Sequence, residues 1–222
     1  MEENNVSFKD YAIVACGTMA PELNYLKQTG FLDAKLIYTT PGLHQVPLEL
    51  DKQLQKQLEA AKKVAKKIIV VFGGKYCYIN MQNPLRTIDT VIEEMQQEGC
   101  FISRTQVENC IDMLASTQER EQLAEGRNIW FTTPGWLKFR DLVFKGWDKA
   151  HANENFGQYS SGMMLDGIGF FDEYAMEHAE EILDFSDWAS IPLEPCNVSL
   201  DRLKEVLISA MAPEDRSLAS AS

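Results

Sequence analysis

Thiol and imidazole side chains lie in four separate turns of the sequence. Cys16 and Cys77 each lie in a glycine-containing loop after an apolar, β-rich run, and His44 and Cys110 come after two other such runs. Three cysteines and one histidine form a familiar tetrahedral ligand set for zinc, and a thiolate-rich set also suits iron or cobalt. The chain has no Cys-x-x-Cys or His-x-x-x-His pair, so these residues form one site only if the fold brings them together.

Two other uses of the cysteines remain open. Cys16 lies just ahead of a predicted helix, whose dipole would stabilise its thiolate, and it could act as a nucleophile with His44 as its base. Alternatively, a cysteine can be a small buried apolar residue, which is common for free thiols. We favour this packing interpretation for Cys100 and Cys196, and a functional one for Cys16 and Cys77.

Short apolar runs and helical patterns alternate along the chain, and this alternation must position the four candidate ligands. It is typical of an α/β fold with a mostly parallel sheet. The expected strands cover residues 11–15, 35–39, 67–72, 101–103, 129–132 and 167–171. The expected helices cover residues 21–27, 48–66, 87–97, 107–114, 119–124, 136–150, 173–183 and 200–211.

The chain shows no internal repeat and no Gly/Ser linker, which favours one domain. We predict a single α/β domain over residues 1–216, with a mostly parallel sheet of about five or six strands and helices on both faces. Residues 217–222 are small and polar and are predicted to form a flexible tail.

Ligands bind outside the carboxyl ends of the strands in open α/β sheets, so the residues that follow each strand are candidates for binding. Gly73 and Gly74 could expose backbone amides to an anion, and Arg104 could supply charge. Thr133 follows the fifth expected strand, and Trp136 opens the next helix as a wall for an organic ligand. We predict that these five residues bind the ligand.

Composition excludes several classes of partner. The 222 residues include 21 Lys and Arg against 33 Asp and Glu, a net charge of −12 that disfavours nucleic acid. The first residues are polar, and the longest apolar runs are about five residues, so neither export nor a membrane span is expected. An odd count of five cysteines argues against a disulfide framework, and a cytoplasmic location follows.

Four segments form an ordered set of motifs along the chain. They are ACGTMAPEL at residues 15–23, Leu43-His44 with Pro47 and Leu50, NCIDML at 109–114 with Ser116, and TTPGW at 132–136. In order and spacing, this set resembles the uncharacterised family called domain of unknown function 1638, found largely in anaerobic archaea and bacteria, over residues 13–207. The resemblance implies an α/β fold and makes Cys16, His44, Cys77 and Cys110 the family-like polar positions.

The resemblance also suggests a metabolic setting, because members of the family are often associated with corrinoid-dependent methyl transfer. The leading hypothesis is a cytosolic protein that holds zinc or iron at Cys16, His44, Cys77 and Cys110. It would serve thiol or methyl-group chemistry in one-carbon metabolism, with a small-molecule thiol or methyl donor as its substrate. The alternatives are a module that binds an organic cofactor such as a corrinoid, and an accessory protein for a methyltransferase or corrinoid protein.

Overall fold

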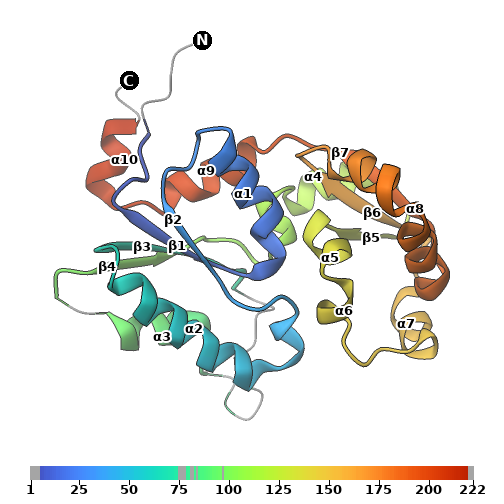
Figure 1. Ribbon diagram of the computed structural model, residues 1–222, viewed down its shortest axis with the longest axis horizontal. Coiled ribbons are helices and arrows are strands. Elements are labelled where there is room, and N and C mark those ends of the chain that lie inside the picture. Colours follow the sequence, from blue (N-terminus) through green and yellow to red (C-terminus); the bar gives the residue numbers. More distant parts are fainter. Residues whose placement is uncertain (1–5, 75–78, 81–82, 84, 97, 220–222) are drawn as a thin grey trace.

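The strands belong to two separate parallel sheets. The computed structural model describes residues 6–74, 79–80, 83, 85–96 and 98–219 (Figure 1). Its strands are β1 (Tyr11–Ala15), β2 (Lys35–Tyr38), β3 (Lys67–Val71), β4 (Phe101–Arg104), β5 (Ile129–Thr132), β6 (Ser161–Asp166) and β7 (Leu193–Asn197). The first sheet has the order β2-β1-β3-β4 and the second β5-β6-β7, with every pair parallel. The predicted α/β class is confirmed, with the strands divided between two sheets.

Helices connect the strands and cover the sheets. The α-helices are α1 (Ala20–Gln28), α2 (Pro47–Lys62), α3 (Ile88–Met95), α4 (Thr117–Ala124), α5 (Pro134–Lys138), α6 (Arg140–Val143), α7 (Lys149–Phe156), α8 (Phe170–Ala189), α9 (Asp201–Ser209) and α10 (Pro213–Ala219). Short 3₁₀ turns form η1 (Gly17–Met19), η2 (Leu43–Gln45) and η3 (Ile111–Met113). Within the described ranges, none of the helices has the length and apolar character needed to cross a membrane.

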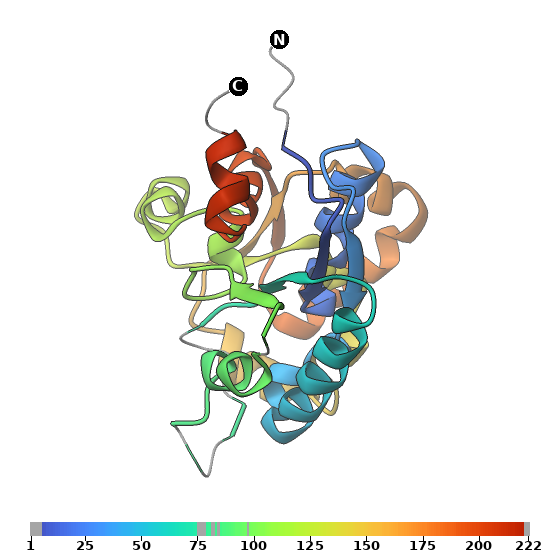
Figure 2. The same ribbon diagram turned by 90° about the vertical axis from the view of Figure 1, so that its left-hand side faces the viewer.

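Strand β1 is the centre of the first sheet, and all five of its residues are buried. Its alternating side chains serve two cores, as the pleat of a strand requires. Ile13 packs in a cluster with α1 and α9, whereas Val14 packs on the opposite face with α2 and α3. Figures 1 and 2 show the first sheet between these two helical layers. Both faces of the strand are therefore covered, which explains its unbroken apolar sequence.

The two sheets share one apolar core. Leu165 of β6 is fully buried in the same cluster as Ile13 of β1, and Leu200, just ahead of α9, belongs to it as well. Burial of apolar surface is the main favourable term in folding, so this shared cluster holds the second sheet against the first.

Aromatic side chains fill the other face of the second sheet. Trp130 of β5 stacks on Phe185 of α8 with ring centroids 5.9 Å apart, and it contacts Phe156 of α7 at 4.6 Å. Phe144 packs on the same group. These aromatic side chains therefore form a packed core, and their large contact area stabilises the second sheet.

The strand predicted over residues 167–171 is wrong, because β6 lies six residues earlier and ends at Asp166. The buried Asp166 carboxylate accepts hydrogen bonds from the backbone N–H groups of Ile168, at 2.9 Å, and Phe171, at 2.7 Å. Gly169 adopts a φ of 72° between them, a conformation that favours glycine. These bonds turn the chain and start α8, so the apolar residues after Asp166 begin a helix.

The single helix predicted over residues 136–150 is also wrong, because the segment forms α5, α6 and the start of α7. Phe139 and Phe144 leave helical geometry at the ends of α5 and α6, with ψ angles of 27° and 32°. Gly146 has a φ of 82°. The aromatic side chains bend the chain around the core of the second sheet instead of continuing one helix.

Three other segments differ from the sequence-based expectation. Residues 107–114 form only the 3₁₀ turn η3, and the Pro-rich segment near residue 195 forms β7. Pro195 is tolerated there because β7 is an edge strand. Of the predicted tail, residues 217–219 belong to α10 and residues 220–222 lie outside the described part of the chain.

We predict that Leu165→Ala lowers the free energy of unfolding by about 2–5 kcal/mol, because it opens a cavity in the core that both sheets share. Urea denaturation followed by circular dichroism measures this change. The matched control is Leu183→Ala, since Leu183 is 69 % exposed and its truncation should change stability by less than about 0.5 kcal/mol. Equal effects of the two substitutions would contradict the shared core.

Candidate functional site

Cys16 lies directly after the central strand of the first sheet. Its backbone N–H donates to the carbonyl of Val71, at 3.2 Å, and so continues the ladder between β1 and β3. Its Sγ atom lies 3.1 Å from the hydroxyl of Thr18 in η1. The thiol therefore projects from a rigid position at the carboxyl end of the sheet, where ligands bind in this class of fold.

Cys110 comes to the same edge on the connection between β4 and α4. The buried carboxylate of Asp112 holds this loop, since it accepts hydrogen bonds from the backbone N–H groups of Glu108 and Asn109, at 3.1 and 3.2 Å. Arg120 forms an ion pair with the same carboxylate. The position of Cys110 is thus set by a buried and charge-compensated turn.

Gly73 allows the Cys110 loop to approach the first sheet. A β-carbon at Gly73 would collide with the backbone of Asn109, so a residue with a side chain would push the loop away. The N–H of Gly74 donates to the carbonyl of Val107, at 2.9 Å, and fixes the same contact. Both glycines were predicted to bind an anion. In the structure they let the Cys110 loop pack closely against the end of β3.

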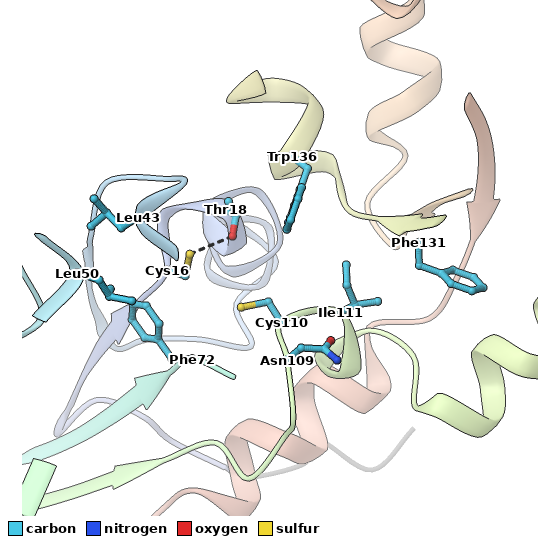
Figure 3. Close-up of a pocket in the computed structure, with 10 residues that line it drawn as sticks. All are labelled: Cys16, Thr18, Leu43, Leu50, Phe72, Asn109, Cys110, Ile111, Phe131 and Trp136. Carbon is cyan, nitrogen blue, oxygen red and sulfur yellow. Dashed lines mark hydrogen bonds between the residues drawn. The ribbon is translucent and has the colours of Figure 1, made fainter. Parts of the chain in front are cut away.

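The thiols of Cys16 and Cys110 lie side by side. A hydrogen bond with Cys110 is the largest influence that raises the pKa of the Cys16 thiol well above its usual value, and burial raises it further. The hydrogen bond with Thr18 acts in the opposite direction and is weaker. Figure 3 shows the two sulfur atoms facing the same space. At neutral pH Cys16 is therefore a thiol rather than a thiolate.

The two thiols form part of the wall of a cavity of about 270 Å³. Its lining comes from both sheets, with β3 and α2 on one side and β5 and α5 on the other (Figure 3). Most of the wall is aliphatic or aromatic. The lining residues are Cys16, Thr18, Leu43, Leu50, Phe72, Asn109, Cys110, Ile111, Phe131 and Trp136.

Trp136, predicted to bind an organic ligand, forms an aromatic wall of this cavity. Its ring meets Trp130 edge to face at 6.0 Å and packs on Phe144 at 5.7 Å. Gly135 brings α5 against η1, because a β-carbon there would collide with the backbone of Thr18. The wall is thus held by the aromatic core behind it and by a close backbone contact beside it.

The other two predicted metal ligands are His44 and Cys77. His44 lies in η2, next to the cavity residue Leu43, but its side chain is outside what the structure describes. Cys77 lies outside the described residues, after Gly74 at the carboxyl end of β3. Within the described residues, no group of three or more His, Cys, Asp or Glu side chains is arranged to hold a metal ion.

The remaining predicted residues, Arg104 and Thr133, are not among the residues that line the cavity. Arg104 is buried and forms a bidentate ion pair with Asp89, at 2.8 and 3.0 Å, and it donates to the carbonyl of Thr105 at 2.7 Å. The Arg104 guanidinium thus has its hydrogen-bond partners inside the protein. Thr133 is buried at the start of α5. Cys196 and Cys100 were predicted to serve packing only. Cys196 packs against the core that contains Ile13, and Cys100 packs against the core that contains Val14.

Sequence reasoning missed one unusual group, the carboxyl of Glu22 in α1. Glu22 is 0 % exposed, and within the described residues neither of its oxygens has a hydrogen-bond partner. Burial raises the pKa of Glu22 to about 8, with a further contribution from the charge of Asp166. Glu22 is therefore mostly protonated at neutral pH. It lies one helical turn after Thr18, a lining residue of the cavity.

Little in the sequence distinguishes Glu22, because an acidic residue in the first turn of a helix is common and usually exposed. Its burial arises from tertiary structure, since α5 packs against α1 and Asp166, at the end of β6, lies close enough for its charge to act on Glu22. Burying a carboxyl with no partner is costly, and such groups often lie near functional sites.

Comparison with known protein families matches residues 38–207 to the family described as Protein of unknown function (DUF1638). The match covers more than three quarters of the chain, so the chain belongs to this family, as its motifs predicted. Cys110 and Trp136 lie within the matched residues, whereas Cys16 precedes them. Searches of curated proteins and of solved structures found no match.

We predict that Glu22→Gln removes a pH-dependent loss of stability. The pKa of Glu22 is about 8 when folded and near 4.5 when unfolded. Its contribution is therefore fully present below about pH 4.5 and is lost as the pH rises through 8, by on the order of 4 kcal/mol. Urea denaturation from pH 5 to pH 9 should show the wild type losing stability relative to the variant.

The control for this series is Glu119→Gln. Its pKa is lowered by hydrogen bonds from Ser116, so the stability that the carboxylate contributes is lost as the pH falls. Between pH 5 and pH 9 this carboxyl stays ionised in both the folded and the unfolded state, so the difference between wild type and Glu119→Gln should stay constant across the series. A pH-independent difference for Glu22→Gln would contradict the buried, protonated carboxyl.

We also predict that Cys110→Ala lowers the pKa of Cys16. The substitution removes the hydrogen bond that contributes most to the raised pKa, so more thiolate forms at a given pH. Alkylation of Cys16 by iodoacetamide, followed by peptide mass spectrometry across a pH series, should show a midpoint at lower pH. Cys196→Ala, which is remote from this contact, should leave the midpoint unchanged.

Proposed function

We propose that this member of the DUF1638 family is a metal-thiolate protein that acts in thiol or methyl-group chemistry. The observation that carries the proposal is the side-by-side placement of the Cys16 and Cys110 thiols in the wall of an apolar cavity. Two soft sulfur donors at one point suit zinc or iron. His44 and Cys77 are the further ligands we propose, because their loops follow β2 and β3 at the same edge.

The chain's own residues determine how such a metal is taken up. Both thiols must lose their protons to become ligands, and the raised pKa of Cys16 makes this loss unfavourable without a cation. Metal binding should therefore release protons and strengthen as the pH rises. When bound, zinc or iron would stabilise a substrate thiol as its thiolate at neutral pH. Trp136 and the aliphatic wall would exclude water from that site.

The corrinoid-linked setting remains part of the proposal through the family, with a methyltransferase or corrinoid protein as partner and the cytoplasm as location. An organic cofactor bound in place of a metal is the second candidate, and the Trp136 wall favours it. However, 270 Å³ is below the range of about 300–1,000 Å³ usual for ligand pockets. The cavity would therefore admit only part of a macrocycle as large as a corrinoid, and we favour the metal.

Elemental analysis of anaerobically purified protein tests the proposal. We expect near-stoichiometric zinc or iron in the wild type and loss of most of it in Cys16→Ser and in Cys110→Ser. Cys196→Ser is the matched control and should retain the metal. Circular dichroism of each variant separates a lost ligand from a lost fold. Absence of metal from the wild type, or retention in both site variants, would overturn the metal-thiolate function.

A further inference from the structure

We infer that the cavity beside Cys16 and Cys110 binds a small, uncharged and largely apolar organic molecule that presents a sulfur group to the two thiols. The sulfur end of this inference rests on the proposed function. The inference that the rest of the ligand is uncharged and apolar rests on the composition and size of the cavity, which do not depend on a bound metal.

Charge is the first constraint on the ligand. The ten described residues that line the cavity include no Asp, Glu, Lys, Arg or His. An ionic group placed there would lose its hydration without gaining an ion pair from this wall, which costs several kcal/mol. The described wall therefore disfavours a carboxylate, a sulfonate or a phosphate.

Two charged side chains on the elements around Cys110 are engaged with partners in the protein. Asp112, two residues after Cys110, binds two backbone N–H groups and Arg120. Arg104, at the end of β4, is paired with Asp89. Neither of these ion pairs leaves a charge directed to a ligand.

The polar atoms of the wall are few. The hydroxyl of Thr18 contacts the Cys16 sulfur at 3.1 Å, and the Asn109 side-chain oxygen accepts a hydrogen bond from the N–H of Asp112 at 3.1 Å. In Figure 3 the Asn109 amide points away from the two sulfur atoms. The thiols are therefore the chief groups that can distinguish one end of a ligand from the other.

Size is the second constraint. The volume of 270 Å³ lies below the range of about 300–1,000 Å³ usual for ligand pockets, so the ligand that fits is small. The aromatic core behind Trp136 prevents that wall from retreating to admit a larger one. A short alkyl or aryl thioether or thiol matches both constraints.

Two isosteric thioethers test the inference by isothermal titration calorimetry on the full chain. The probes are methylthiobutanoate, which is an anion, and the methyl ketone in which a methyl group replaces one carboxylate oxygen. We expect the ketone to bind at least ten-fold more tightly, and Trp136→Ala to weaken its binding at least ten-fold. Equal or tighter binding of the anion, or no binding of the ketone, would overturn the inference.

A change of charge at the wall provides the matched comparison. Ile111→Lys should shift the preference toward the anion by at least ten-fold, whereas Ile111→Gln should leave the ketone preferred. Metal content, measured on the same samples, separates the two proposals. Binding of the ketone by metal-free protein would support the inference and remove the metal function, whereas preference of a metal-loaded protein for the anion would do the reverse.

Discussion

Close backbone approach at two glycines is the constraint on which the site depends. At Gly73 the Cys110 loop lies against the end of β3, and at Gly135 the start of α5 lies against η1. Neither contact leaves room for a β-carbon. The first contact brings Cys110 to Cys16, and the second brings the Trp136 wall over them. The cavity therefore arises where the two sheets meet rather than within either one.

The meeting of Cys16, Cys110 and Trp136 at one cavity could be predicted from strand ends, because parallel strands deliver their carboxyl ends to one edge. This reasoning selected Cys16 and Cys110, which lie together, and Trp136, which lines the same cavity. The division of the strands into two sheets could not be predicted in this way. Hydrophobic periodicity indicates that a strand exists, but pairing depends on contacts distant in sequence, such as that of Leu165 with the core around Ile13.

The incorrect elements also have local physical causes. Asp166 ends β6 because its carboxylate accepts hydrogen bonds from one N–H group ahead of α8 and one in the first turn of α8, a role that hydrophobic periodicity does not indicate. Phe139 and Phe144 interrupt the helix predicted over residues 136–150 because their rings pack into the second core. In each case a side chain preferred a tertiary or capping contact over the regular element that its neighbours indicated.

The cavity combines thiols that are hard to ionise with a wall that offers no charge. A hydrogen bond between the two thiols and burial both keep Cys16 protonated, so the site has little intrinsic nucleophilic reactivity. Its thiols gain reactivity only from a species that replaces their protons, and a soft cation does this directly. Glu22, which is mostly protonated at neutral pH, adds little negative charge. A wall whose described residues carry no charged side chain thus favours a soft, weakly hydrated ligand over an ionic one.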